Sequence, residues 1–251
     1  MQQFVDSVLE KNGFNLEDGS WYKLTSAISK TEADFLRSLI SMSQPKTTLE
    51  IGCAEGVSSM VICDAIGREN KHTILDPNQS GHWKNMGVNN LKKAGLENFT
   101  LIEDYSEFVL PELLRKGEQY DFIFVDGWHT FDHVMLEFFY INRLLPIGGV
   151  VAFDDVALIS LNRLMRYISN YPNFKVIGSA GDFYESPKRK TLDRIKKAIN
   201  GIATPLGTKL KKEFLSDTVI RSSESLKING SIAAFKKIAN DERGWAWYES
   251  F

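Results

Sequence analysis

The sequence predicts an α/β protein built on a mostly parallel sheet, and three observations support this. Short apolar runs alternate with helical patterns from residue 47 onward, as in parallel strands joined by crossover helices. Several of these runs end in glycine or aspartate, and open α/β sheets bind their ligands at that edge. The 251 residues, 43% hydrophobic and 25% charged, can bury the core of one large domain or of one domain with an insertion.

The first 45 residues precede this alternation, and we expect them to form a helical cap over the sheet edge. The segment TEADFLRSLISMS, residues 31–43, has helical spacing, with Thr31 as the N-cap and a carboxylate in the first turn. The cap is therefore placed at residues 1–45 and the main domain at residues 46–251.

The strands and helices of the main domain follow one another in alternation. The expected strands are TTLEIG, HTILDP, FTLIED, YDFIFVDG, GVVAFDDV, FKVIGS and SIAAFKKI. Apolar spacing predicts helices over residues 57–67, 84–94, 106–116, 131–145 and 159–171. Gly148 and Gly149 predict a turn that leads into the strand after them.

One segment departs from the average composition. Between residues 187 and 217, KRKTLDRIKKAINGIATPLGTKLKK contains nine Lys or Arg and one Asp, with Leu192, Ile195, Ile199 and Ile202 at helical spacing. We expect this basic amphipathic insertion to cover the sheet or to contact a second subunit, which favours a homo-oligomer. Attraction of an anionic acceptor or of a membrane surface is the alternative.

Composition argues against several classes of protein. A formal net charge of −2 gives no overall reason to expect nucleic acid as a partner. The N-terminus carries charges throughout and no 18 apolar residues run together, so neither export nor stable membrane insertion is indicated and the cytoplasm is expected. Cys53 and Cys63 are too few for a disulfide framework or a zinc site and are expected to be packing residues.

The chemistry begins at LEIGCAEGVSS, residues 49–59. Gly52 and Gly56 allow a tight turn between a strand and a helix that starts near Val57. Position 54 is alanine, so the second glycine of a dinucleotide-binding G-x-G-x-x-G loop is missing. The next strand ends in Asp76, at the right distance to accept hydrogen bonds from a ribose diol. A nucleoside without phosphates therefore fits better than NAD.

At these motifs the sequence resembles the class I S-adenosylmethionine-dependent methyltransferases, and more closely the metal-dependent catechol O-methyltransferase-like branch with its bacterial small-molecule and sugar relatives. The resemblance covers residues 28–156 and includes LEIGCAEGVSS, TLIEDYSEFVLPEL, FVDGWHTFDHV and AFDD. It implies a Rossmann-like seven-stranded sheet with a reversed last strand, and S-adenosyl-L-methionine as cofactor. The cofactor-binding residues that it implies are Glu50, Gly52, Gly56, Ser58, Asp76, Asp104, Ser106 and Trp128.

Three carboxylates follow two of the predicted strands. Asp126 ends one strand, and Asp154 and Asp155 end the next. Because the carboxyl ends of parallel strands share one edge, we expect these side chains to converge. An all-oxygen set suits Mg²⁺ or another hard divalent cation, and the resemblance gives the three aspartates that role. Ordinary alternatives are a helix N-cap at Asp126 and an Asx turn at the Asp154-Asp155 pair.

The sequence and the resemblance together predict a Mg²⁺-dependent O-methyltransferase that acts on a hydroxyl of a small molecule such as a sugar, a catechol or another diol. His129, with Asp126 beside it, is the expected catalytic base, and His133, one helical turn further on, is the rival. Trp128 stacks on adenine or provides ordinary hydrophobic cover. A metal-independent N- or O-methyltransferase, a nicotinamide-dependent oxidoreductase and a non-catalytic nucleoside-binding subunit are the alternatives.

Overall fold

The computed structural model describes residues 2–16, 18–182 and 221–249, together with positions 191, 194, 195, 198 and 251. Apart from the isolated positions 191, 194, 195 and 198, the basic insertion expected at residues 187–217 lies outside the described residues. Its predicted contact with the sheet or with a second subunit therefore stays a prediction.

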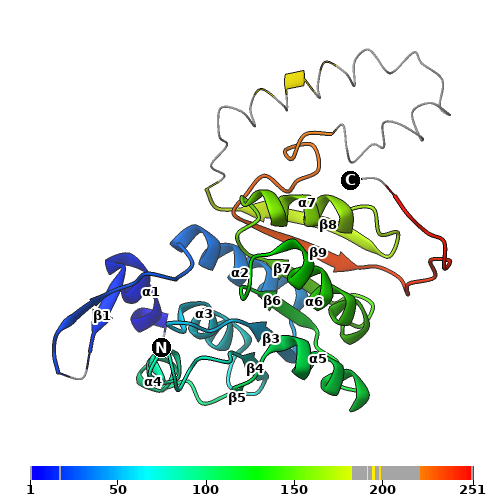
Figure 1. The fold of residues 1–251 in the computed structure, drawn as a ribbon. Coiled ribbons are helices and arrows are strands. Elements are labelled where there is room, and N and C mark those ends of the chain that lie inside the picture. The colour runs from blue at the N-terminus through cyan, green and yellow to red at the C-terminus, as the bar shows by residue number, and fades with distance from the viewer. Residues whose placement is uncertain are drawn as a thin grey trace.

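A seven-stranded sheet forms the centre of the molecule (Figure 1). Its strand order is β5-β4-β3-β6-β7-β9-β8, and β9 runs antiparallel to both of its neighbours. This confirms the predicted mostly parallel sheet with a reversed last strand. The strands are β3 (Thr47–Ile51), β4 (Lys71–Leu75), β5 (Phe99–Ile102), β6 (Phe122–Val125), β7 (Val150–Phe153), β8 (Phe174–Ala180) and β9 (Ile232–Lys237).

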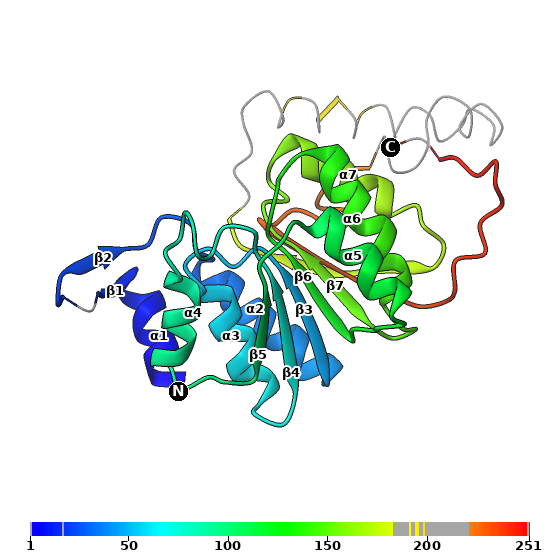
Figure 2. The same ribbon diagram turned by 60° about the horizontal axis from the view of Figure 1, so that its bottom comes forward.

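Helices cover both faces of the sheet, as predicted (Figure 2). One layer holds α5 (Ser106–Arg115), α6 (Phe131–Leu144) and α7 (Ile159–Ile168). The other holds α1 (Gln2–Lys11), α2 (Lys30–Ser43), α3 (Val57–Ile66) and α4 (Met86–Lys93). In the part of the chain that the structure describes, no helix is both long enough and apolar enough to span a bilayer.

The two helical layers bury opposite faces of the same strands. In β6, Ile123 and Val125 pack into the core under α5 to α7, whereas Phe122 and Phe124 pack into the core under α1 to α3. This alternation follows from the period of two along a strand. Both faces are apolar because both are covered, which explains why the parallel strands appear in the sequence as continuous hydrophobic runs.

The N-terminal region contains more than the expected helical cap. A short antiparallel hairpin of β1 (Gly13–Asn15) and β2 (Trp21–Lys23) lies between α1 and α2. The predicted N-cap of α2, Thr31, is wrong because the helix begins at residue 30 and Ser29 caps it. The Ser29 hydroxyl accepts the Glu32 N–H, and the Glu32 carboxylate accepts the Ser29 N–H, so two amides at the helix start are satisfied.

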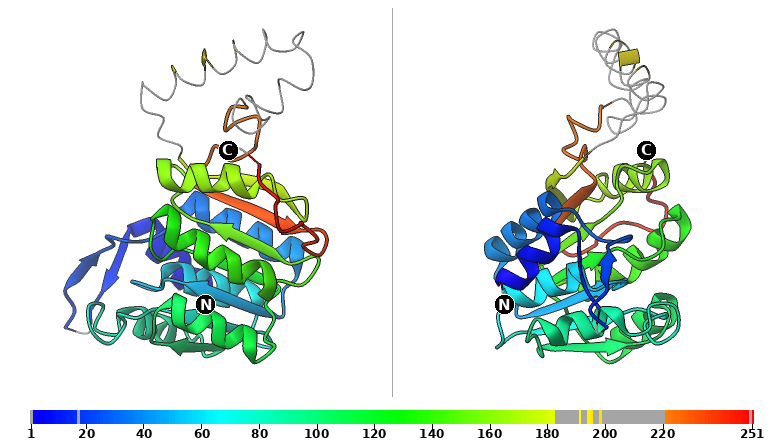
Figure 3. Two further views of the ribbon diagram at one scale, coloured as in Figure 1. Left: turned by 45° about the vertical axis from the view of Figure 1, so that its right-hand side comes forward. Right: turned by 90° about the vertical axis from the view of Figure 1, so that its left-hand side faces the viewer.

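The aromatic C-terminus packs against α6 and α7 rather than against the N-terminal cap (Figure 3). The Trp247 ring lies 5.2 Å from the Tyr171 ring, and Phe251 stacks on Phe131 at 5.7 Å between ring centroids. The cap is on the other side of the molecule, next to α3 and α4 (Figure 2). These terminal aromatic residues therefore pack on the helical layer opposite the cap.

The core under α6 is centred on Phe138, which is fully buried and contacts the rings of Phe153, Tyr171 and Phe174. We expect Phe138→Ala to lower the free energy of unfolding by about 3–5 kcal/mol, because it removes a buried ring and leaves a cavity. Urea denaturation measures the change. The adjacent Phe139 is 47% exposed, so Phe139→Ala is the matched control and costs less than about 1 kcal/mol. Equal losses in the two variants would contradict this assignment of the core.

Candidate functional site

The glycine-rich loop after β3 turns sharply against the neighbouring strand. Gly52 has a φ of +92°, and a β-carbon at this position would overlap the carbonyl oxygen of Asp126. Gly56 has a φ of +80°, and a β-carbon there would lie 2.7 Å from the Cα of Gly87 at the start of α4. Both positions therefore require glycine, the first for close approach to β6 and the second for close approach to α4.

Asp76, which follows β4, holds this loop in place. Its Oδ2 accepts the backbone N–H groups of Cys53 at 3.0 Å and Ala54 at 2.9 Å, and its Oδ1 accepts the N–H of Asn78 at 2.8 Å. The side chain is almost fully buried. The residue expected to bind a ribose is therefore also the residue that positions the loop.

A pocket of about 550 Å³ opens at the carboxyl edge of the sheet. Five predicted site residues line it: Gly52, Asp76, Ser106, Asp126 and Trp128. Trp128 is 65% exposed, so it is available as a stacking surface and is not buried cover. The remaining lining residues are Ser26, Ile51, Ala54, Leu75, Pro77, Asn78, His82, Trp83, Tyr105, Glu107, Gly127, His133 and Glu137.

Four other predicted cofactor residues lie outside the pocket lining, namely Glu50, Gly56, Ser58 and Asp104. Glu50 is fully buried on the α3 side of the sheet, where its Oε2 accepts hydrogen bonds from Ser59 and His72. Because Glu50 points away from the pocket lining, direct contact with a cofactor is not supported by its position.

His72, near the start of β4, lies in the interior of the protein and does not line the pocket. Its side chain is fully buried. Its Nδ1 lies 2.8 Å from the Thr48 hydroxyl, and its Nε2 lies 3.0 Å from Glu50 Oε2. The imidazole is buried because two polar side chains on the adjacent strand provide its hydrogen-bond partners.

The N-terminal region forms part of the pocket wall through a buried carboxylate that the sequence reasoning missed. Glu55, in the glycine-rich loop, accepts hydrogen bonds from the Tyr22 hydroxyl, from the Thr25 N–H and hydroxyl, and from the Ser26 N–H at 2.7 to 3.1 Å. Ser26 itself lines the pocket. The cap is therefore fastened to the loop rather than simply packed over the sheet edge.

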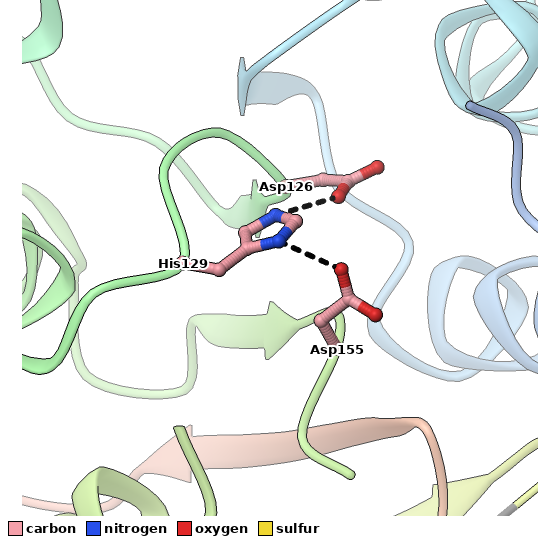
Figure 4. Close-up of side chains that lie close together, drawn as sticks. All are labelled: Asp126, His129 and Asp155. Atoms are coloured by element: carbon pink, nitrogen blue, oxygen red, sulfur yellow. Dashed lines mark ion pairs between the residues drawn. The ribbon is translucent and has the colours of Figure 1, made fainter. Parts of the chain in front are cut away.

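Asp126, His129 and Asp155 come together beside this pocket (Figure 4). His129 Nδ1 lies 2.8 Å from Asp155 Oδ2, and His129 Nε2 lies 3.6 Å from Asp126 Oδ1. One ligand atom from each residue lies within 4.8 Å of the other two. His129 Nε2 is buried and has no hydrogen-bond partner among the described residues. The two carboxylates offer oxygen ligands of the kind that suits a hard divalent cation.

Asp154 was predicted as a metal ligand, but the structure places His129 in the cluster and leaves Asp154 outside it. Asp154 is 9% exposed, and its Oδ1 accepts the N–H of Asp155 at 2.8 Å. Asp155 has a φ of +53°, so the chain turns at this residue. In this arrangement Asp154 shapes the turn that presents Asp155.

Burial and like charges perturb the acidic side chains. Burial raises the pKa of Asp126 to about 6, and burial together with the charge of Asp126 raises the pKa of Asp154 well above its usual value. The carboxylates of Asp126 and Asp155 raise the pKa of His129 to about 10. Without another cation the imidazole is therefore charged at neutral pH and is not free to act as a base.

The rival base, His133, contacts a different group of residues. Its Nε2 lies 3.2 Å from Ser106 Oγ, 3.3 Å from Glu137 Oε1 and 3.7 Å from Glu107 Oε2. Glu137 was not singled out from the sequence, although its position four residues after His133 places both on one face of α6.

Comparison with known proteins identifies the part of the chain that carries this site. Residues 49–156 match the family model described as a methyltransferase domain. Tapetum-specific methyltransferase 1 of Arabidopsis thaliana is 32% identical over 126 residues, 49% of this chain and 52% of that protein. Caffeoyl-CoA O-methyltransferase 2 of Populus trichocarpa is 29% identical over 139 residues, 54% of each chain. The chain thus spans about half the length of these curated relatives.

Solved structures share the fold. An O-methyltransferase from Bacillus cereus in complex with SAH has a TM-score of 0.57 at 19% identity, covering 69% of this chain and 82% of that one. The O-methyltransferase TomG from Streptomyces achromogenes, in complex with SAM, has a TM-score of 0.55 at 20% identity, covering 70% and 79%.

The raised pKa of His129 predicts how stability depends on pH. The ring is charged up to about pH 10 in the folded protein but only up to about pH 6.5 in the unfolded chain. Its contribution is therefore fully present below about pH 6.5 and is lost as the pH rises to about 10. In EDTA, the melting temperature of the wild type should exceed that of His129→Gln most at pH 6.5, and the difference should shrink toward pH 10. A difference that stays constant over this range would contradict the charged state.

Proposed function

We propose that this chain, whose residues 49–156 match the family model of a methyltransferase domain, belongs to the class I, catechol O-methyltransferase-like family and transfers a methyl group from S-adenosylmethionine to a hydroxyl of a small molecule. The observation that carries the proposal is the position of Asp126. It lines the pocket that the glycine-rich loop and Asp76 form, and it also belongs to the cluster with His129 and Asp155. The methyl group of a cofactor in that pocket would lie close to groups that can hold and activate the oxygen of a methyl acceptor.

The pocket has the groups that a nucleoside sulfonium requires. Asp76 provides a buried carboxylate for ribose hydroxyls, and Trp128 provides an exposed aromatic face at the pocket wall. A positively charged sulfonium bound at the Asp126 end of the pocket would gain from the negative charge of that carboxylate. The two solved O-methyltransferases that share the fold are in complex with SAM and SAH, which supports this cofactor.

Asp126 and Asp155 are the residues that would hold a divalent cation, with Mg²⁺ as the first candidate. When bound, it would lower the pKa of an acceptor hydroxyl and fix the direction of that oxygen. His129 lies between the two carboxylates, which hold it protonated as long as they have no other partner. His129 can take the acceptor's proton only when these carboxylates are engaged elsewhere, so its role as a general base depends on an occupied cation site.

The acceptor must present its nucleophilic oxygen about 3 Å from the methyl carbon and in line with the bond that breaks. Trp128, Leu158 and Ile159 are exposed apolar side chains close in sequence to His129 and Asp155. The Ser160 hydroxyl donates to the His129 carbonyl oxygen at 2.9 Å and so fixes the start of α7 next to the cluster. A small acceptor with adjacent oxygens and an apolar body fits these surroundings, and sugars or other diols are the alternatives.

Cofactor binding provides the first test. Isothermal titration calorimetry should show that S-adenosylhomocysteine binds the wild type, and that Asp76→Ala weakens binding by at least about tenfold, because a buried hydrogen-bonding carboxylate is lost. Asp104→Ala is the control, since Asp104 is exposed and lies outside the pocket lining; its affinity should stay within about twofold. Wild-type affinity in Asp76→Ala would reject this binding site.

The cation is tested separately by following release of S-adenosylhomocysteine with a panel of small diol acceptors. Asp155→Ala and Asp126→Asn should abolish the Mg²⁺-stimulated turnover, and Asp155→Ala should leave the affinity for S-adenosylhomocysteine within about threefold, because Asp155 does not line the cofactor pocket. Asp154→Asn should retain part of the stimulation, since Asp154 shapes the turn before Asp155. Full wild-type turnover in excess EDTA would instead support a metal-independent methyltransferase.

A further inference from the structure

Three polar side chains meet at one wall of the cofactor pocket, and none of the roles given above uses all of them. Ser106 begins α5, and His133 and Glu137 lie one turn apart on α6. Ser106 Oγ lies 2.7 Å from Glu137 Oε1 and 3.2 Å from His133 Nε2. All three residues line the pocket.

The group does not have the geometry of a nucleophilic triad. In such a triad the acid contacts the ring nitrogen on the side away from the nucleophile. Here Ser106 Oγ and Glu137 Oε1 both contact Nε2 of His133, at 3.2 and 3.3 Å. The serine proton points at the carboxylate rather than at the imidazole. The three residues therefore form a recognition surface and not a reactive serine.

The direction of the Ser106 hydrogen bond follows from the chemistry of the partners. A carboxylate oxygen accepts hydrogen bonds, and the Ser106 hydroxyl donates to Glu137 Oε1 at 2.7 Å. A hydroxyl has one proton and two lone pairs. With its proton committed to Glu137, Ser106 can offer only a hydrogen-bond acceptor to a ligand in the pocket.

Glu137 is buried without a full set of hydrogen bonds. It is 1% exposed, and its second oxygen, Oε2, is buried with no hydrogen-bond partner among the described residues. Burying a carboxylate that lacks part of its hydrogen bonds costs folding free energy, so its presence calls for a functional reason. His133 supplies some compensation, and its contact with Glu137 raises the pKa of the imidazole.

The position of the group in the pocket indicates which part of a nucleoside it meets. Ser106, His133 and Glu137 line the same pocket as Asp76, which is assigned to the ribose, and Asp126, which is assigned to the sulfonium, and we assign the base to this third group. At C6, adenine has an amino group that donates hydrogen bonds, and hypoxanthine has an oxygen that accepts them. A hydrogen-bond acceptor at Ser106 can pair with the amino group of adenine but not with the oxygen of hypoxanthine.

We propose that Glu137 is a positioning residue that fixes Ser106 as a hydrogen-bond acceptor and thereby selects a 6-aminopurine over a 6-oxopurine in the cofactor. The proposal rests on the proposed function, because it assumes a purine nucleoside in this pocket. Glu137 acts through Ser106 and does not need to touch the ligand, which agrees with its nearly complete burial.

The test compares the affinities for S-adenosylhomocysteine and for its deaminated analogue S-inosylhomocysteine by calorimetry. The wild type should bind the adenosyl compound at least about tenfold more tightly, because the inosyl oxygen would face another acceptor. In Glu137→Gln the side-chain amide can donate to Ser106 and release its proton toward the ligand, so the ratio of the two affinities should fall to within about threefold. Ser106→Ala removes the acceptor and should lower the ratio in the same way.

Glu112→Gln is the matched control, because it removes one carboxylate from an exposed position on α5 and should leave the wild-type ratio unchanged. A wild-type ratio in both Glu137→Gln and Ser106→Ala would overturn the proposal, and Ser106→Ala decides alone if Glu137→Gln does not fold. Equal wild-type affinities for the two compounds would also overturn it while leaving the proposed function intact. Failure of the wild type to bind either compound would instead count against the proposed function.

Discussion

The close contact between Gly52 and the backbone of Asp126 joins the two parts of the site. It exists because β3 and β6 are adjacent parallel strands, so the loops that follow them leave the sheet side by side. A side chain at residue 52 would force those loops apart. The pocket depends on the first loop and the carboxylate cluster on the second, and Asp126 belongs to both. The order of the central strands therefore determines the distance between a bound cofactor and the groups that would activate an acceptor.

Much of the fold could be predicted from the sequence because both faces of the sheet are covered. Continuous apolar runs identify strands such as β6 and β7, and the helices between them have clear apolar spacing. The hairpin of β1 and β2 could not be predicted, since its strands have three residues each and include exposed positions. The predicted N-cap residue of α2 was two positions too late. Ser29 and Thr31 are both acceptable N-cap residues, and the choice between them depends on the position of Glu32.

In the site, too, the positions set by the strands could be predicted, whereas those set by loop conformation could not. That Asp126 and Asp155 converge follows from parallel strands ending at one edge, and this could be predicted. That Asp154 accepts the N–H of Asp155 and stays outside the cluster could not, because it depends on the positive φ of Asp155, a conformation that aspartate adopts only occasionally. Glu50 could have been placed correctly, since strand alternation puts it on the face opposite Leu49 and Ile51, where α3 covers it.

The attachment of Glu55 to the N-terminal region has a consequence for the order in which the protein assembles. The donors to this buried carboxylate come from residues about 30 positions earlier in the chain, so the loop is without them until that segment has docked. Before docking, Glu55 would remain hydrated, and the loop would sample conformations that do not shape a pocket. The central sheet can thus form before this loop is fixed, whereas a shaped pocket requires the N-terminal segment to be docked.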